Sequence, residues 1–372
     1  MDADSPDGTD ALQALVEQVR EAAAAGRALR IRGGGTKDFY GEPARVPDAQ
    51  LLEVGALRGI SAYEPSELVV TVRAGTPLAE LEAALAEQGQ CLPFEPPRFA
   101  PGGTVGGMVA AGLCGPARAS AGSVRDYVLG ATLLNGRAQL LSFGGQVMKN
   151  VAGYDVSRLL AGSLGILGVI CEVSLKVLPR PAAQATLRFE LDQAQALRRL
   201  NEWGGQPLPL NASAWWDGTL VVRLAGAAAA VQAACQRLGG EAVEPARAEG
   251  FWLGLRDHDD EYFRGAQAAV QAGATLWRLG MPSTAPVLTL PGNALVEWGG
   301  AQRWLLSEAP AADIREAARA AGGHATIFRG THHLQAGVFA PLQPAVARIH
   351  RALKQAFDPA GIFNPGRLLP DL

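Results

Sequence analysis

The chain has 372 residues, of which 48% are hydrophobic and 19% charged, and its formal net charge is −3. This is the composition of a globular protein long enough for two domains, each with its own core. The small net charge and the absence of a long basic run exclude a nucleic-acid groove as the main function.

The cysteines and the apolar runs narrow the possibilities further. The four cysteines are far apart and form no CxxC pair: Cys91, Cys114, Cys171 and Cys235. We therefore expect no metal site and no iron–sulfur cluster held by this chain alone. The first ten residues are acidic and lack the apolar core of a signal peptide, and no run of about 18 apolar residues occurs. We expect a cytoplasmic protein that reaches a membrane only through partners.

The first part of the chain predicts one long helix followed by several strands. Leu12, Leu15, Val16 and Val19 recur at helical spacing, and Gly26 can end that helix. Strands are predicted at 29–32, 59–64, 68–73, 128–134, 138–143 and 169–177.

Three local signals organise this part. Thr76 followed by Pro77 predicts an N-cap and the first residue of a helix. Asn135-Gly136 between two apolar runs predicts a β-hairpin. Pro179 and Pro181 break the last strand pattern, so we place a domain boundary at residue 181.

The middle of the chain carries the tryptophans and a different pattern. Strands are predicted at 187–191, 212–216 and 220–224, and helices at 193–203 and 227–238. This mixture indicates an α+β domain with helices on one face of a sheet. The C-terminal segment holds an amphipathic helix and then the turn-rich stretch 358–367, which we expect to pack against a structured part of the chain.

Three glycine-rich segments are the candidate binding motifs. In the first, Arg32-Gly33-Gly34-Gly35-Thr36-Lys37, consecutive backbone N–H groups can form a nest for phosphate. It matches neither a P-loop nor a Rossmann fingerprint. The second is Pro101–Gly107 with Gly112, and the third comprises 150–155 and 162–170. Glycine in both would let the backbone approach a ligand closely. Each segment also has a purely structural interpretation, as a glycine turn, a surface loop or tight packing.

Together, the order and texture of these segments resemble the PCMH-type FAD-binding domain of the vanillyl-alcohol-oxidase class. The resemblance implies an α+β fold: a two-part PCMH-type FAD-binding domain with a separate α+β cap domain built on an antiparallel sheet. We expect the FAD domain at 1–181, the cap domain at 182–328, and a C-terminal segment at 329–372 that returns to the FAD domain. Ser123–Val128 and 358–367 also look like elements of this family.

The motifs and the resemblance give a predicted set of FAD-binding residues. They are Arg32, Gly33, Gly34, Gly35, Thr36, Lys37, Pro101, Gly102, Gly103, Thr104, Gly106, Gly107, Gly112, Val124, Asp126, Gly153, Gly162, Ser163, Gly165, Gly168, Val169, Ile170 and Asn364. Many family members attach FAD through a histidine in the first loop. Position 36 is threonine here, so we expect non-covalent FAD.

Four further segments are similar to the family of glycolate oxidase E subunits: 276–279, 282–286, 296–304 and 324–329. The resemblance implies an FAD-binding subunit of a glycolate (2-hydroxy-acid) oxidase complex, accessory or electron-transferring rather than the main oxidising subunit. It implies a catalytic flavoprotein partner and an iron–sulfur partner. The alternatives are a self-sufficient FAD-dependent 2-hydroxy-acid dehydrogenase and a scaffold that has lost FAD.

Residues for substrate chemistry are less evident. None of the five histidines lies in the E-x-E-H setting of hydroxy-acid-oxidising relatives, and no metal site is predicted. His332 and His333 are candidates for contacting a substrate, whereas His258 is expected in a solvated charged turn. Arg278 and Arg329 are candidates for binding a carboxylate, because guanidinium pairs with it in bidentate fashion. The alternative for both arginines is a surface or interface ion pair.

Overall fold

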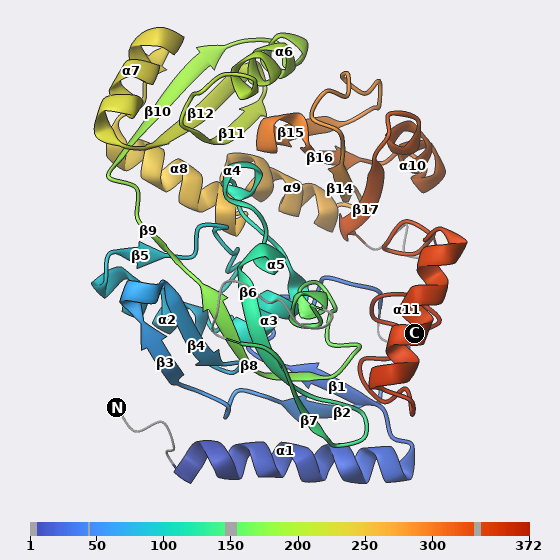
Figure 1. Cartoon of the computed structure of the whole chain (residues 1–372). Helices are drawn as coiled ribbons and strands as arrows, with labels where there is room; N and C mark the ends of the chain where they lie inside the picture. Colours follow the sequence, from blue (N-terminus) through green and yellow to red (C-terminus); the bar gives the residue numbers. More distant parts are fainter. Residues whose placement is uncertain (1–5, 44, 146–154, 331–335) are drawn as a thin grey trace.

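The computed structural model describes residues 6–43, 45–145, 155–330 and 336–372. Its two main sheets lie one above the other in Figure 1, with helices α8 (Pro245–Asp257) and α9 (Glu261–Gln271) between them. The described residues up to Arg180 build the lower part, and the following segment up to Arg329 builds the upper part. Helix α11 (Pro344–Phe357) runs along one side and leads back to the lower part.

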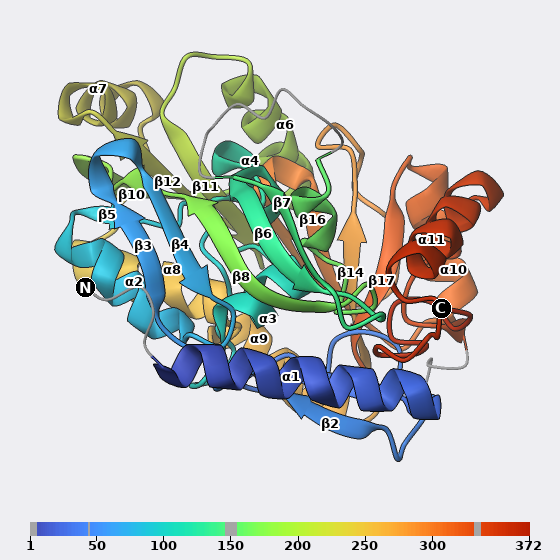
Figure 2. The same cartoon turned by 60° about the horizontal axis from the view of Figure 1, so that its bottom comes forward.

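Helix α1 (Pro6–Ala25) packs on a small parallel sheet of β1 (Leu29–Arg32) and β2 (Gln50–Glu53) (Figure 2). Its apolar stripe is buried, and Val19 and Leu52 are completely covered in the same cluster. The predicted helix and first strand are therefore confirmed. This layer holds the strand from which the first glycine motif starts.

The main sheet of the lower part has five antiparallel strands in the order β3-β4-β8-β6-β7. They are β3 (Ile60–Glu64), β4 (Val69–Arg73), β8 (Val169–Lys176), β6 (Val128–Leu134) and β7 (Leu140–Gly144). Helices α2 (Leu78–Glu87) and α3 (Val105–Ala111) pack apolar side chains into the core of this part. Shorter elements are η1 (Pro65–Glu67), β5 (Gln90–Cys91), α4 (Arg118–Ala121), α5 (Val124–Tyr127), η2 (Ser157–Leu160) and β9 (Leu178–Pro179).

The upper part is an eight-stranded antiparallel sheet in the order β13-β10-β12-β11-β15-β16-β14-β17. The strands are β10 (Ala183–Glu190), β11 (Leu210–Trp216), β12 (Thr219–Gly226), β13 (Glu241–Ala242), β14 (Thr275–Gly280), β15 (Asn293–Glu297), β16 (Gln302–Ser307) and β17 (His324–Arg329). The remaining elements are α6 (Gln193–Gly204), α7 (Ala228–Leu238), η3 (Trp298–Gly300) and α10 (Ala311–Ala320).

Helices cover both faces of this sheet, so the prediction of helices on one face is wrong. Helices α6, α7 and α10 pack on the outer face, whereas α8 and α9 pack on the inner face (Figure 1). The inner face carries Leu276, Leu295 and Trp304, which share one buried cluster with Ala111 and Leu113 of the lower part. Side chains along a strand alternate between the two faces, and both faces of this sheet carry apolar side chains. Each face therefore needs helices to cover it from water.

Two local predictions are corrected by the structure. Pro77, not Thr76, is the N-cap of α2, and the Thr76 hydroxyl instead accepts a hydrogen bond from the Gly59 N–H at 2.9 Å. The hairpin of β6 and β7 is confirmed, but its loop is longer than the Asn135-Gly136 dipeptide, because the Asn135 N–H bonds the Gln139 carbonyl at 3.0 Å. A side chain at Gly136 would meet Asp358, so packing also requires this glycine.

The C-terminal segment packs against the lower part of the molecule. Leu29 donates its N–H to the Ile362 carbonyl at 2.7 Å, and the Asn364 N–H bonds the Leu29 carbonyl at 2.9 Å. The buried Lys354 ammonium is 2.7 Å from Asp358 and also bonds two backbone carbonyls. We propose 1–181, 182–328 and 329–372 as the three parts of the chain, although β17 extends to Arg329.

Candidate cofactor-binding site

The first two glycine motifs lie against each other. The first follows β1 directly, and a Cβ atom built on Gly34 would lie 1.6 Å from the carbonyl oxygen of Gly102. A Cβ atom on Gly33 would lie 2.3 Å from the Thr104 hydroxyl oxygen. Since real side chains cannot approach that closely, glycine at these positions is what allows the two loops to touch.

The second motif enters helix α3 and is fixed on both sides. The Leu78 N–H bonds the Gly103 carbonyl, and the Gly106 N–H bonds the Ala74 carbonyl, both at 2.7 Å. Thr104 is the N-cap of α3, and its side chain accepts from the Gly107 N–H at 3.2 Å. The loop is therefore held rigidly by α2 and by the end of β4.

The third motif meets α3 and the C-terminal segment. Gly112 ends α3 with φ 63°, and a Cβ atom there would lie 2.8 Å from the Gly162 nitrogen. The Gly165 position faces Asn364, whose side-chain amide donates to the Leu164 carbonyl at 2.7 Å. Asn364 also accepts from the Ile31 N–H at 2.9 Å, so it ties this segment to β1.

These contacts enclose a cavity that we call the cradle. It is lined by Ile31, Arg32, Gly33, Gly34, Gly35, Thr36, Lys37, Asp38, Thr104, Gly107, Ala110, Ala111, Leu164, Asn364 and Arg367. Main chain and small side chains dominate this lining. Such a surface allows a flat or phosphate-bearing ligand to approach the backbone closely.

Lys37 brings a positive charge into the lining of the cradle. Burial lowers the pKa of the Lys37 ammonium to about 8, and the negative charge of Asp257 acts in the opposite direction. Among the described residues Lys37 makes no ion pair, although Asp38 pairs with Arg30 and Arg32 at 2.8 and 3.0 Å. A desolvated ammonium without a close counter-ion favours an anionic ligand.

Some predicted FAD-binding residues do not line the cradle. Asp126 forms a capping box with Ser123, and Val124 is fully buried in the core. Pro101 is exposed, and Ser163 is buried beside the cradle, where it can accept from the Gly165 N–H. The end of the third motif lies in or against the sheet at Gly168, Val169 and Ile170. Gly153 lies outside the described residues.

Sequence reasoning missed two residues that shape the cradle, Asp38 and Arg367. One nitrogen of the Arg367 guanidinium donates to the carbonyls of Lys37, Asp38 and Tyr40 at 2.9–3.3 Å. Arg367 thus fixes the shape of the first loop from the end of the chain. In the sequence, the only indication of this role is that Arg367 is the basic residue at the end of the turn-rich stretch 358–367.

The two arginine candidates for substrate contact lie on strands of the cap sheet, Arg278 in β14 and Arg329 in β17. Arg278 projects from β14, and its Nε donates to Gln302 at 3.0 Å. The Arg329 guanidinium lies 3.5 Å from the centre of the Phe39 ring, and burial lowers the pKa of Arg329. The two arginines therefore face the domain junction and not bulk solvent, without a carboxylate partner among the described residues. His332 and His333 lie outside the described residues.

His258 is not in a solvated turn, so that prediction is wrong. It ends α8 with φ 58°, and its ring is buried and stacks on Phe263 with 3.6 Å between ring centres. Burial, together with the charges of Arg329 and Arg278, lowers the pKa of His258 well below its usual value. Its neighbours in sequence are charged, but the αL backbone turns this side chain into an aromatic cluster.

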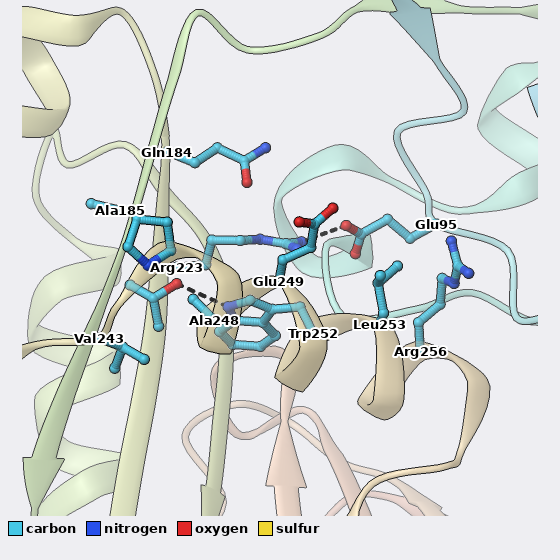
Figure 3. Close-up of a pocket in the computed structure, with 12 residues that line it drawn as sticks. Glu95, Gln184, Ala185, Arg223, Val243, Ala248, Glu249, Trp252, Leu253 and Arg256 are labelled. Atoms are coloured by element: carbon cyan, nitrogen blue, oxygen red, sulfur yellow. Dashed lines mark hydrogen bonds and ion pairs between the residues drawn. The ribbon is translucent and has the colours of Figure 1, made fainter. Parts of the chain in front are cut away.

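A second pocket lies at the boundary between the two parts of the molecule (Figure 3). Arg223 of β12 points across the pocket to Glu95 of the lower part, and the two charges are 2.6 Å apart. The Arg223 guanidinium also lies over the Trp252 ring and bonds Asn211. Because its main charges already satisfy one another, we interpret this pocket as an inter-domain junction.

Comparison with known proteins agrees with the geometry of the cradle. Residues 8–144 match the family model described as an FAD binding domain, and residues 340–368 match the C-terminal domain of FAD linked oxidases. The solved structure of alkyldihydroxyacetonephosphate synthase superposes with a TM-score of 0.62 at 16% identity, over 96% of this chain and 76% of that one. Fold and cradle together define an FAD-binding protein of the FAD-linked oxidoreductase class.

Sequence relatives specify the family. The chain is 48% identical to the glycolate oxidase subunit GlcE of Escherichia coli (strain K12) over 363 residues, which are 98% of this chain and 99% of that protein. The chain belongs to the GlcE family. It is also 30% identical to the glycolate oxidase subunit GlcD of Bacillus subtilis (strain 168) and to a D-lactate dehydrogenase of Anaerostipes hadrus. Those matches cover 41–42% of this chain and 32–33% of the relatives.

These findings confirm the predicted family, the predicted fold class and FAD as the cofactor. Within the described residues, no helix is both long and apolar enough to span a bilayer. In the same part of the chain, no three His, Cys, Asp or Glu side chains are grouped as metal ligands.

Proposed function

We propose that this chain is the FAD-binding subunit of a glycolate-type (2-hydroxy-acid) oxidoreductase complex, and that it transfers electrons rather than performing most of the substrate oxidation. The observation that carries the proposal is the cradle, in which four segments far apart in sequence converge. Similarity to a glycolate oxidase subunit over nearly the whole chain supports the substrate class.

The lining of the cradle fits FAD. The touching loops at Gly34 and Gly102 would bring backbone close to the diphosphate, and Lys37 would supply a positive charge there. Asn364 and Arg367 would keep the first loop in place. Thr36 occupies the position where relatives carry a linking histidine, so the cofactor would be held without a covalent bond. FAD would supply acceptance of a hydride and onward transfer of electrons.

The proposed complex explains why this sequence has neither the histidine motif of hydroxy-acid-oxidising relatives nor clustered cysteines. None of its histidines has the E-x-E-H setting, and its four cysteines are not clustered. A catalytic flavoprotein subunit would therefore perform the main oxidation, and an iron–sulfur subunit would take the electrons. Both partners would be cytoplasmic neighbours of this chain, and contact with the inner membrane would occur through them.

A self-sufficient 2-hydroxy-acid dehydrogenase is the second candidate function. The observation in its favour is the Arg278 guanidinium, which faces the domain junction without a carboxylate partner among the described residues. A base, for which His332 or His333 is the candidate, would then take the hydroxyl proton. A scaffold without FAD is the third reading, and the close loop contacts in the cradle argue against it.

One set of purifications separates these functions. The full chain would be purified alone and with the flavoprotein and iron–sulfur partners, and flavin content and anaerobic flavin reduction by glycolate would be measured. We expect bound FAD in both samples and rapid reduction only in the complex. Rapid turnover by the isolated chain would favour the self-sufficient dehydrogenase, and absence of flavin from both samples would favour the scaffold.

A further inference from the structure

The sequence motif Val296–Trp304 forms the β15–β16 hairpin, whose side chains the cradle does not use. Strand register places Glu297 opposite Gln302, and Gln302 opposite Gly280 of β14. Arg278, two residues before Gly280, lies opposite Trp304. Because strand residues alternate between faces, the Glu297, Gln302 and Arg278 side chains share the inner face of the cap sheet.

The hairpin is anchored firmly on both sides. Trp298 adopts a left-handed conformation with φ 54°, and its indole N–H donates to the Gly115 carbonyl at 3.0 Å. The Arg118 and Arg278 guanidinium groups lie 4.8 and 5.5 Å from the centre of the Trp298 ring. On the outer face, Arg303 donates to the carbonyls of Ala285 and Pro286 at 2.5 Å. Side chains on the inner face are therefore held in fixed positions.

One buried hydrogen-bond donor on this face lacks a partner among the described residues. The Gln302 oxygen accepts from Arg278 Nε, but the Gln302 Nε2 amide has no acceptor in that part of the chain, and the residue is 1% exposed. Arg278 is half-buried, and its terminal nitrogens make no hydrogen bond or ion pair to the described residues. Buried donors in native proteins are rarely left unsatisfied, so the Gln302 amide points to an acceptor that binds from outside, next to the Arg278 guanidinium.

Glu297, an acid on the same face, does not neutralise Arg278. Glu297 is 4% exposed and accepts from the Trp304 indole at 2.6 Å. Burial raises the pKa of Glu297 to about 8, and the Trp304 hydrogen bond and the charge of Arg278 oppose that rise. At neutral pH the carboxyl is therefore mostly protonated, which leaves the positive charge of Arg278 uncompensated.

The location connects this face to the cradle. Ala111 lines the cradle, and Cys114 follows three residues later in the chain. Burial raises the pKa of the Cys114 thiol, whereas the charges of Arg278 and Arg118 act in the opposite direction, which places both cations near that segment.

We infer that Arg278 and Gln302 form a binding site for the carboxylate of a small hydroxy acid, with the Glu297 carboxyl next to the hydroxyl group. Arg278 offers two parallel N–H groups and Gln302 a third donor, and this is the geometry that a carboxylate accepts. The inference rests on the proposed function and deepens it, because it gives this subunit a substrate-class site whether or not it turns the substrate over.

The test is binding of glycolate and of oxalate to the purified, FAD-loaded full chain, measured by calorimetry and by perturbation of the flavin spectrum. We expect R278M to weaken binding by about 100-fold and Q302L by about 10-fold. R278K keeps the positive charge but loses the two parallel N–H donors of the guanidinium, and it should weaken binding by about 10-fold. R188M is the matched control, because Arg188 lies on the same sheet in exposed surface pairs. It should bind like the unchanged chain.

Flavin content and thermal unfolding of each variant show whether it is folded. If the folded R278M, R278K and Q302L variants all bind glycolate as tightly as the unchanged chain, the assignment is overturned. It is equally overturned if the unchanged chain binds neither acid. Failure of the proposed function would look different: binding would depend on Arg278, but the complete complex would not oxidise glycolate.

Discussion

The cradle and the inner face of the cap sheet are built in opposite ways. The cradle is mostly main chain and small side chains, and its lining comes from the end of β1, the glycine loop after it, helix α3 and the C-terminal segment. The cap face is built from large polar side chains, Arg278, Glu297 and Gln302, that three strands hold in register. A binding site made of backbone therefore tolerates almost no side-chain addition. A side-chain site depends instead on individual charges and hydrogen bonds.

The largest expected effect tests the backbone character of the cradle. G34V should abolish FAD binding, because its Cβ atom would start 1.6 Å from the Gly102 carbonyl oxygen and drive the loops apart. The flavin-to-protein ratio after gel filtration measures this. G250A is the control, since Gly250 is exposed in α8 and a Cβ atom there meets nothing within 4 Å. Full FAD occupancy in G34V would contradict a cradle made by loop contact.

The ion pair of Arg223 with Glu95 joins the upper and lower parts of the molecule (Figure 3). Arg223 is 8% exposed and Glu95 26% in their ion pair. R223M should therefore lower the free energy of unfolding by about 3 kcal/mol, because it removes the cation that pairs with a partly buried carboxylate. Urea titration measures the loss, and the double variant R223M/E95Q should recover part of it.

The control for that pair is Arg264, whose ion pair with Asp259 is more than 60% exposed at both partners. R264M should change the free energy of unfolding far less than R223M does, because solvent screens an exposed ion pair. If R223M and R264M lowered the free energy of unfolding equally, the Arg223–Glu95 pair would not stabilise the contact between the upper and lower parts of the molecule.

The same contrast explains what the sequence could predict. Glycine runs such as Gly33–Gly35 are visible in one sequence because a backbone site needs them consecutively, and the structure places them in one cavity. The hydrogen bond between Arg278 and Gln302 could not be predicted from the sequence, because strand pairing brings together two residues that are 24 positions apart. His258 was misjudged because its charged neighbours suggested solvent, whereas the backbone at that residue is αL and the ring is buried.

Stability should depend on pH through Glu297, the protonated carboxyl group on the inner face of the cap sheet. Glu297 binds a proton up to about pH 8 when folded, against an ordinary pKa of 4.5 when unfolded. The folded state therefore holds more protons, and the unchanged chain should lose stability as pH rises between about 5 and 8. E297Q cannot titrate, so its stability relative to the unchanged chain should rise by up to about 1.4 kcal/mol for each pH unit in that window.

Urea unfolding at pH 5.5, 7 and 8.5 measures this difference. E316Q is the control, because Glu316 is an exposed partner of Arg319 and the pKa of Glu316 is lowered. A pH-independent difference between E297Q and the unchanged chain would mean that Glu297 is ionised in the folded protein, and the Arg278 charge would then be compensated.

The smallest effect is expected from Lys37, a charge in the cradle lining that makes no ion pair among the described residues. K37M should weaken FAD binding by about 10-fold at pH 7, because one ammonium–phosphate interaction is lost while the loop contacts remain. The pKa of Lys37 is about 8 without ligand, and a bound anion raises it. FAD affinity of the unchanged chain should therefore be constant below about pH 8 and fall above it, whereas that of K37M should show no such decline. Fluorescence titration of the deflavinated chain at pH 7 and 9 measures both. If K37M lost FAD as completely as G34V, the cradle would depend on charge as much as the cap face does, and the contrast between the two regions would not hold.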